Sequence, residues 1–247
     1  MRNVLRITPL ALIPFVLVAA CDGNKADKKP EKKASAAAQK PAPTGHGEIQ
    51  GVVKFEGTVP PPEPWGGAGN ADCRTLHPDT IQLVKVDDGK LEDAFVYVKS
   101  GLPEGTYPVP EAKVEFDQKG CEFSPRVFGI MAGQTMATAN SDKLMHNVKS
   151  AEWNQAFPFG VKKDMKLDNP AVMNVIKCDV HPWMRAYAGV MEHPYFAVTK
   201  KDGAFDLKGL VDGEYTVAAW HEKLGTTEQK VKVAGGAPAK VELVFKK

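Results

Sequence analysis

From His46 to the C-terminus, the chain is a succession of short runs of β-branched and aromatic residues separated by turn signals. The run GEIQGVVKF, residues 47–55, alternates apolar and polar positions with the period of two expected of a half-buried strand. Asp-Gly pairs at 88–89, 202–203 and 212–213 are typical of tight turns between strands. The 22 Gly and 19 Pro favour many short strands over long helices. We therefore predict an all-β fold built from β-sandwiches.

Composition and charge exclude several classes of protein. The chain is 43% hydrophobic and 8% aromatic, which argues against a disordered, collagen-like or polytopic membrane protein. Its 32 Lys and Arg nearly balance its 30 Asp and Glu, so no nucleic-acid partner is expected. Paired carboxylates, a Ser-His-Asp set and a phosphate-binding loop do not stand out either. We therefore expect a binding or carrier protein and not an enzyme.

The first 45 residues are expected to form an export signal followed by a tether. The apolar run 7–20 is too short to span a bilayer and follows two arginines, which predicts a signal peptide over residues 1–20. Residues 18–21, VAAC, resemble the lipobox of bacterial lipoproteins. The resemblance implies that Cys21 is lipidated and anchors an exported protein to a membrane, on the periplasmic or cell-envelope side; the alternative is a plain signal peptide. Residues 21–45, rich in Ala, Lys and Pro, contain too few apolar residues to fold and predict a disordered tether.

The folded part contains two different sequence patterns. Residues 194–247 contain TKKDGAF and then LVDGEY, and resemble the carboxypeptidase regulatory-like (transthyretin-like) sandwich. Residues 46–110 resemble the first strands of the same module, whereas residues 111–193 carry a different pattern. We therefore predict a small discontinuous sandwich, 46–110 plus 194–247, with a second domain inserted at 111–193. A single merged sandwich is the alternative.

The inserted stretch holds four potential metal ligands. Cys178, His181 and Met184 lie within seven residues, CDVHPWM, between two strand-like runs, so they share one tight loop. His146 lies upstream, at the start of another strand-like run. One thiolate, two imidazoles and a thioether match the blue-copper set, in which two His and one Cys surround the metal and a Met lies at a long axial distance. Zinc is less favoured, because its structural sites seldom use a thioether, and the absence of Cys-x-x-Cys-His argues against c-type haem.

These residues resemble the cupredoxins. The two-residue gaps on either side of His181 are most similar to the short amicyanin-type ligand loop, and GQTMATANSDKLMHNV is similar to the cupredoxin segment G-x-x-V-x-F-x-N-x-D-x-x-x-H-N. The resemblance implies a Greek-key sandwich of the cupredoxin type over 111–193, which would hold one type 1 copper through the four ligands named above. Its function would be to carry single electrons.

The same resemblance gives roles to three neighbouring residues. Asn147 would donate hydrogen bonds that fix the ligand loop and tune the sulfur; the alternative is a polar residue that merely begins a strand. Pro182 and Trp183 would form an apolar docking patch for a redox partner such as a c-type cytochrome or an exported oxidoreductase. The alternative for Trp183 is a core aromatic residue.

A rival function comes from the carboxypeptidase regulatory-like part. On this interpretation the protein is a membrane-tethered interaction module that binds a partner or a cell-envelope polymer, and its cupredoxin domain is structural or handles copper. Copper stoichiometry and colour would separate the two functions.

The four cysteines divide into three roles. With Cys21 on a lipid and Cys178 on copper, Cys73 and Cys121 are left over in an oxidising compartment, where spare thiols pair. We therefore predict one disulfide between them. The alternative is a second metal site that contains Cys73 and His77.

The remaining histidines carry weaker signals. His46 lies at the end of the predicted tether and is expected to be solvated. His193 and His221 stand in strand-like surroundings, where a hydrogen-bonded structural histidine is the common outcome. No functional role is predicted for either residue.

Overall fold

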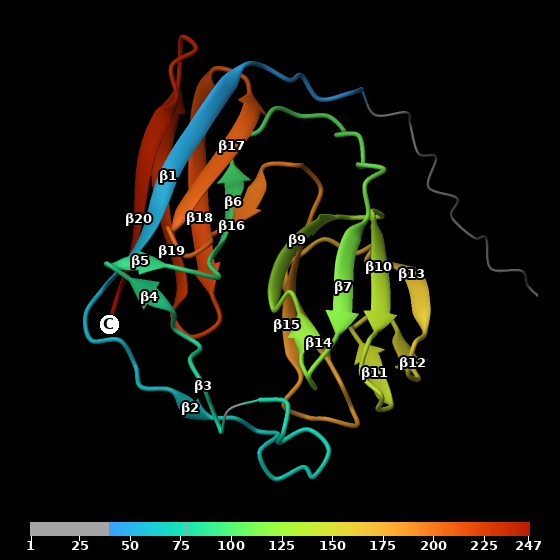
Figure 1. The fold of residues 1–247 in the computed structure, drawn as a ribbon. Coiled ribbons are helices and arrows are strands. Elements are labelled where there is room, and N and C mark those ends of the chain that lie inside the picture. Colours follow the sequence, from blue (N-terminus) through green and yellow to red (C-terminus); the bar gives the residue numbers. More distant parts are fainter. Residues whose placement is uncertain (1–39, 78) are drawn as a thin grey trace, which may run out of the picture. The chain divides into compact units, whose positions relative to one another are not determined.

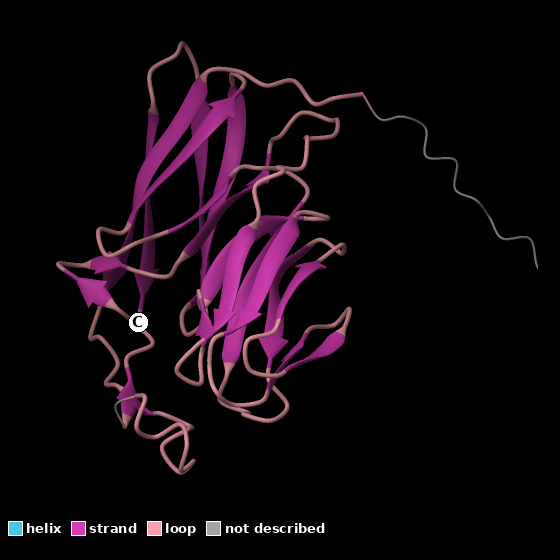
Figure 2. Cartoon of the chain, turned by 45° about the vertical axis from the view of Figure 1, so that its right-hand side comes forward, coloured by secondary structure: helices cyan, strands magenta, loops and turns pink. Residues whose placement is uncertain are grey.

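The computed structural model describes residues 40–77 and 79–247, and within these residues the protein is all-β (Figures 1 and 2). The predicted fold class is confirmed. No helix in the described part of the chain is long and apolar enough to cross a membrane. The predicted signal peptide, the lipidated Cys21 and most of the predicted tether lie outside the described residues.

Strands from both ends of the described chain form a first sandwich. Its strands are β1 (Gly47–Glu56), β4 (Val86–Asp87), β5 (Lys90–Leu91), β6 (Phe95–Ser100), β16 (Phe196–Val198), β17 (Ala204–Leu210), β18 (Gly213–His221), β19 (Gly225–Val233) and β20 (Ala239–Lys246). One sheet has the order β17-β1-β5-β4, with β20 also paired to β1, and the other has the order β16-β6-β18-β19. Two short strands, β2 (Glu63–Pro64) and β3 (Thr80–Ile81), pair with each other in the loop that leads from β1 to β4.

The first strand shows how the sequence produces this sandwich. Ile49, Val53 and Phe55 are buried in its core, as the alternation along β1 predicts. Gly51 lies on the same face by this alternation, and a Cβ there would come within 2.4 Å of the Phe205 ring and 2.3 Å of a backbone oxygen in β20. The glycine therefore lets an aromatic ring of the neighbouring strand lie across β1.

Nine consecutive strands form a second sandwich. They are β7 (Val114–Gln118), β8 (Phe123–Ser124), β9 (Val127–Met131), β10 (Thr135–Asn140), β11 (His146–Lys149), β12 (Asn154–Phe157), β13 (Lys162–Lys166), β14 (Ala171–Lys177) and β15 (Arg185–Met191). One sheet has the order β13-β10-β7-β8 and the other β12-β11-β14-β15-β9. Phe116, Phe128, Phe157 and Ile176 are buried between the sheets. The chain leaves the first sandwich after β6 and returns to it at β16.

Apolar packing joins the two sandwiches. Phe95 and Ala218 of the first sandwich form one buried cluster with Val127 and Met191 of the second. Gly189 in β15 lies so close to the Phe95 ring that a Cβ would meet it at 2.1 Å. The two sandwiches therefore share a close-packed contact in addition to the two chain connections.

Part of the predicted tether is bonded to the first sandwich. The backbone N–H of Ala42 donates to the carbonyl of Thr106 (2.9 Å), and that of Gly45 donates to the carbonyl of Gly209 (2.9 Å). Residues 41–45 thus follow the surface of this sandwich before β1 begins.

Candidate metal centre

The four predicted ligands gather at one end of the second sandwich. Cys178 directly follows β14, and β15 begins directly after Met184. The loop between them is closed by two backbone hydrogen bonds, from Cys178 N to Met184 O (3.3 Å) and from Met184 N to His181 O (2.9 Å). His146 is the first residue of β11, which is the neighbour of β14 in the sheet. Sheet pairing therefore brings the distant histidine to the ligand loop.

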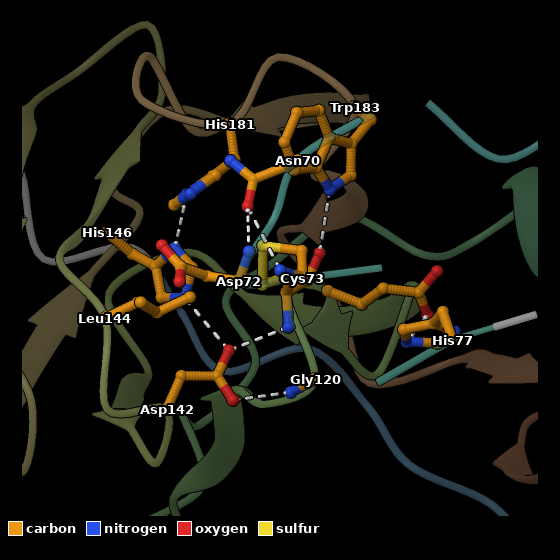
Figure 3. The surroundings of a disulfide bond; sticks show 12 residues. Asn70, Asp72, Cys73, His77, Gly120, Asp142, Leu144, His146, His181 and Trp183 are labelled. Atoms are coloured by element: carbon orange, nitrogen blue, oxygen red, sulfur yellow. Dashed lines mark hydrogen bonds and ion pairs between the residues drawn. A yellow bond between two sulfur atoms is a disulfide. The ribbon is translucent and has the colours of Figure 1, made fainter. Parts of the chain in front are cut away.

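Three donor atoms face one another in the buried centre of this group. The two Nδ1 atoms of His146 and His181 are 2.8 Å apart, and Cys178 Sγ lies 3.9 Å from His181 Nδ1. Figure 3 shows the two imidazole rings turned toward each other. All three ligand atoms lie within 4.8 Å of one another, and all three residues are buried. Two imidazole nitrogens and one sulfur that converge in this way fit a copper ion.

Met184 lies in the same region. Its side chain is fully buried and belongs to the core cluster that contains Cys178. Met184 is therefore part of the apolar core that surrounds the thiol, which is where a weak axial ligand is expected.

The surroundings of Cys178 favour its thiolate. Burial raises the pKa of the thiol, but hydrogen bonds to the sulfur outweigh burial, and the pKa lies below its ordinary value. The donors are the His146 ring and the backbone N–H groups of Asn147, His181 and Val180. Two of these backbone nitrogens lie 3.5 Å and 3.3 Å from the sulfur. The thiolate that a copper site needs is thus stabilised by the protein itself.

Asp142 holds His146 from the side opposite the donor atoms. Its Oδ2 lies 2.9 Å from His146 Nε2. Burial lowers the pKa of His146, but contacts with Cys178 and Asp142 outweigh burial and raise it. With Nε2 bonded to a carboxylate, Nδ1 is left to face His181, an arrangement that orients metal-binding histidines. This role of Asp142 was not predicted from the sequence, although the residue lies four positions before His146 within the segment GQTMATANSDKLMHNV.

The pKa of His181 is shifted in the opposite direction from that of His146. Burial lowers its pKa, and the positive charge of His146 lowers it further. A neutral imidazole keeps a free lone pair, which is the form that binds a metal. The side chain is only 6% exposed, so its ring is largely shielded from solvent.

Asn147 is the second residue of β11, and its side chain contacts the ligand loop. Its Oδ1 accepts a hydrogen bond from Asp179 N (2.5 Å), and its Nδ2 donates to Asn154 Oδ1 (2.6 Å). Its own backbone N–H points at Cys178 Sγ. The residue therefore connects the thiol, the first residue after it and the neighbouring strand β12.

The two predicted docking residues differ in exposure. Pro182 is exposed, whereas Trp183 is half-buried and lies beneath a loop of the first sandwich. The Trp183 ring lies 5.8 Å from that of Trp65 and 5.1 Å from that of His181. Two exposed apolar side chains, Met145 and Val180, were not predicted as docking residues, and each adjoins a predicted histidine ligand in sequence.

The predicted disulfide between Cys73 and Cys121 is present, with 5.8 Å between the Cα atoms. It ties the loop between β2 and β3 to the turn between β7 and β8. The alternative metal site with Cys73 is therefore wrong, because this thiol is oxidised. His77 instead stacks on Trp65 (4.8 Å between ring centres) and lies 3.5 Å from a carboxylate oxygen of Glu122.

His46 is exposed, as expected, whereas His193 and His221 have structural surroundings. His193 Nδ1 accepts a hydrogen bond from the backbone N–H of Tyr195, and the two rings stack. His221 is buried, and its Nδ1 accepts from the backbone N–H of Lys223. Within the described ranges, neither residue belongs to a group of His, Cys, Asp and Glu close enough to share a metal ion.

Comparison with known proteins gives structural likenesses only. No family model and no curated protein matches the chain. Among solved structures, a copper-containing nitrite reductase (NirK) from Thermus scotoductus is 19% identical over 38% of this chain and 26% of its own length, with a TM-score of 0.31. A purple cupredoxin from Nitrosopumilus maritimus is 18% identical over 31% of this chain and 98% of its own length (TM-score 0.28). Amicyanin from Paracoccus versutus is 20% identical over 38% and 96% (TM-score 0.29). The chain thus spans about a quarter of the length of the nitrite reductase. The candidate metal centre is supported by the geometry of this chain's own residues.

Proposed function

We propose that this protein is a type 1 copper protein that carries single electrons. The observation that supports the proposal best is the convergence of His146 Nδ1, His181 Nδ1 and Cys178 Sγ at one buried point. Met184 lies in the same core and would be the weak axial ligand. We further propose that lipidated Cys21 anchors the protein to a membrane on the periplasmic or cell-envelope side, where it meets a redox protein such as a c-type cytochrome or an exported oxidoreductase.

Copper, when bound, would supply one-electron exchange between its two oxidation states. The residues of the chain hold one set of donors for both states, so that little has to rearrange when the electron moves. Burial of the ligands excludes water, and the hydrogen bonds to Cys178 lower the pKa of its thiol, which favours the thiolate that copper binds. Asp142 and Asn147 fix the orientation of His146 and of the ligand loop.

Copper loading tests the proposal directly. The purified protein, loaded with Cu(II), should bind one copper per chain and show an intense visible absorption and the narrow hyperfine splitting of type 1 copper in electron paramagnetic resonance. Cys178→Ala should abolish the colour, because the intense band arises from the thiolate. A colourless wild-type protein after loading would overturn the proposal.

Replacement of the axial ligand gives a second test. Met184→Leu should leave copper bound and raise the reduction potential, because a weak donor to Cu(II) is removed. Met165→Leu is the matched control, because Met165 is buried in the same core but is not a predicted ligand. Equal potentials for Met184→Leu and Met165→Leu would show that Met184 is not a ligand.

A groove in the first sandwich favours a second candidate function, a membrane-tethered interaction module. The groove has a volume of about 940 Å³ and is lined by Phe205, Lys200, Asp202, Lys240 and Glu242, among others. An aromatic ring beside charges of both signs suits a polar ligand such as a cell-envelope polymer. Co-sedimentation with isolated peptidoglycan should then be lost in a Lys200→Ala, Lys240→Ala double variant. Equal sedimentation of wild type and variant would rule this groove out.

A further inference from the structure

Cys121 makes contacts on three sides that all lead to the metal centre or to the first sandwich. Its backbone N–H donates to Asp142 Oδ2 (2.7 Å), and its carbonyl accepts from Trp183 Nε1 (3.1 Å). Its sulfur is bonded to Cys73. Figure 3 shows the surroundings of the disulfide, with Cys73, Asp142 and Trp183 labelled. The residue is fully buried and has a positive φ of 57°, a conformation that a non-glycine residue keeps only where its surroundings determine it.

The first two contacts each lead to a histidine ligand. Asp142 receives N–H groups from Gly120 (2.6 Å) and Cys121 (2.7 Å), and Oδ2 also contacts His146 Nε2 (2.9 Å). The carboxylate thus depends on the 120–121 turn for its position. Trp183 lies two residues after His181 in the ligand loop, and their ring centres are 5.1 Å apart. One turn is therefore bonded to both segments that carry imidazole ligands.

The third contact connects this turn to the first sandwich. The loop around Cys73 is closed by Asn70, whose Oδ1 accepts the backbone N–H groups of Asp72 and Cys73 (3.0 Å each). The same loop covers Trp183. A Cβ at Gly66 would lie 2.6 Å from Trp183 Cβ, and one at Gly67 would lie 2.7 Å from the indole ring. Bulkier residues at 66 and 67 would therefore displace the loop from the tryptophan.

We propose that Cys121 is a positioning residue of the metal centre. It fixes His146 through Asp142 and the His181 segment through Trp183, and the disulfide makes this arrangement depend on the Cys73 loop of the first sandwich. The inference rests on the proposed function, because it assumes that the three donors bind copper. The copper affinity of the centre then depends partly on the first sandwich, which supplies no ligand.

Removal of the disulfide is the primary test. In a Cys73→Ser, Cys121→Ser double variant of the full chain, copper affinity measured by competition with a chromophoric chelator should fall by about 10-fold or more, because loss of groups that orient metal ligands typically costs 10- to 100-fold. The hyperfine splitting should change as well. Leu243→Ala is the matched control, because it weakens the core of the first sandwich away from Cys121 and should leave affinity and splitting unchanged.

A combined variant separates positioning from general stability. Asp142→Asn replaces one of the two acceptor oxygens that hold the 120–121 turn and removes the charge, Trp183→Phe removes the donor to the Cys121 carbonyl, and both leave the disulfide in place. If Cys121 acts through these two residues, breaking the disulfide in an Asp142→Asn, Trp183→Phe background should lower copper affinity little further. If breaking the disulfide in that background lowered copper affinity as much as it does in wild type, the proposal would be overturned, because the disulfide would then act by another route.

The metal-free protein provides an independent measurement. Alkylation of Cys178, quantified by peptide mass spectrometry, should be faster in the disulfide variant and in Trp183→Phe than in wild type, because the loop no longer holds the site closed. Equal alkylation rates and equal copper affinities would overturn the proposal. A wild-type chain that binds no copper but shows the faster alkylation in both variants would overturn the proposed function and leave the positioning role supported.

Discussion

The ion pair between Arg126 and Glu222 offers a quantitative test of how the two sandwiches are joined. Arg126 directly precedes β9, and Glu222 directly follows β18, so the pair crosses between the sandwiches. Nε donates to Oε1 (2.5 Å) and Nη2 to Oε2 (2.8 Å). The guanidinium also lies 5.9 Å from the centre of the Tyr187 ring. Burial lowers the pKa of Arg126, but the hydrogen bond and charge of Glu222 outweigh burial and raise it, so the guanidinium is charged.

The expected cost of Arg126→Ala follows from the burial of the two partners. Loss of one partner of a fully buried pair costs about 3–5 kcal/mol, because the remaining charge is left uncompensated. The Glu222 side chain is 7% exposed and would be such a charge, whereas the Arg126 side chain is 23% exposed, so water screens part of the interaction. We therefore expect Arg126→Ala to lower the free energy of unfolding by about 2–4 kcal/mol.

Urea unfolding of a double-mutant cycle measures this value. Arg126→Ala, Glu222→Gln and the double variant should show a coupling energy within the range of about 0.5–3 kcal/mol typical of residues in contact. The matched control is Lys99→Ala, which breaks a pair with Glu228 whose side chains are 50% and 48% exposed. It should lower the free energy of unfolding clearly less than Arg126→Ala does, because water screens an exposed pair. A cost for Arg126→Ala no larger than that for Lys99→Ala, or strict additivity in the cycle, would refute the reasoning.

Three further substitutions have defined outcomes. Burial lowers the pKa of His193 from 6.5 to about 4, so its contribution to stability is complete above pH 6.5 and is lost as the pH falls through 4, by about 3 kcal/mol in all; His193→Gln should flatten this acid loss in urea unfolding, whereas His46→Gln at an exposed position should not. Gly189→Ala places a Cβ 2.1 Å from a buried phenylalanine ring and should lower the free energy of unfolding by about 1–3 kcal/mol; Gly69→Ala, with no atom within 4 Å of the new Cβ, should have little effect on urea unfolding. Asn147→Ala loses two side-chain hydrogen bonds and should cost about 1–3 kcal/mol and accelerate copper loss to a chelator, and an unchanged loss rate would contradict its role in fixing the loop.

The ligand loop could be predicted because its information is local. Cys178, His181 and Met184 lie within seven residues between two strands, so their spacing alone places them on one turn. His146 required one more step, the assumption that its strand lies beside the loop, and the pairing of β11 with β14 brings it there. The disulfide followed from counting cysteines, not from any knowledge of distance.

The support around the ligands depends on contacts that no local pattern contains. Asp142 meets Cys121 across 21 residues, and Trp183 meets it across 62. Trp65, in a loop of the first sandwich, covers Trp183. The alternation of residues along a strand cannot predict such a contact between loops. The sequence therefore left Trp183 either in a docking patch or in the core, because residue type alone cannot show which side of a ring another loop occupies.

Contacts with the first sandwich reach the surroundings of the predicted metal centre in the second. Every predicted ligand belongs to the second sandwich, yet Trp183 is covered by Trp65, and Cys121 is bonded to Cys73, both from the first sandwich. If residues 111–193 were separated from the rest, Trp183 would lose its cover and Cys121 would lose its disulfide partner. A ligand set depends on the groups that orient it as well as on its donor atoms. We therefore expect the two sandwiches to act together in copper binding, with the predicted donors on one and the Cys73 loop, which is bonded to the 120–121 turn, on the other.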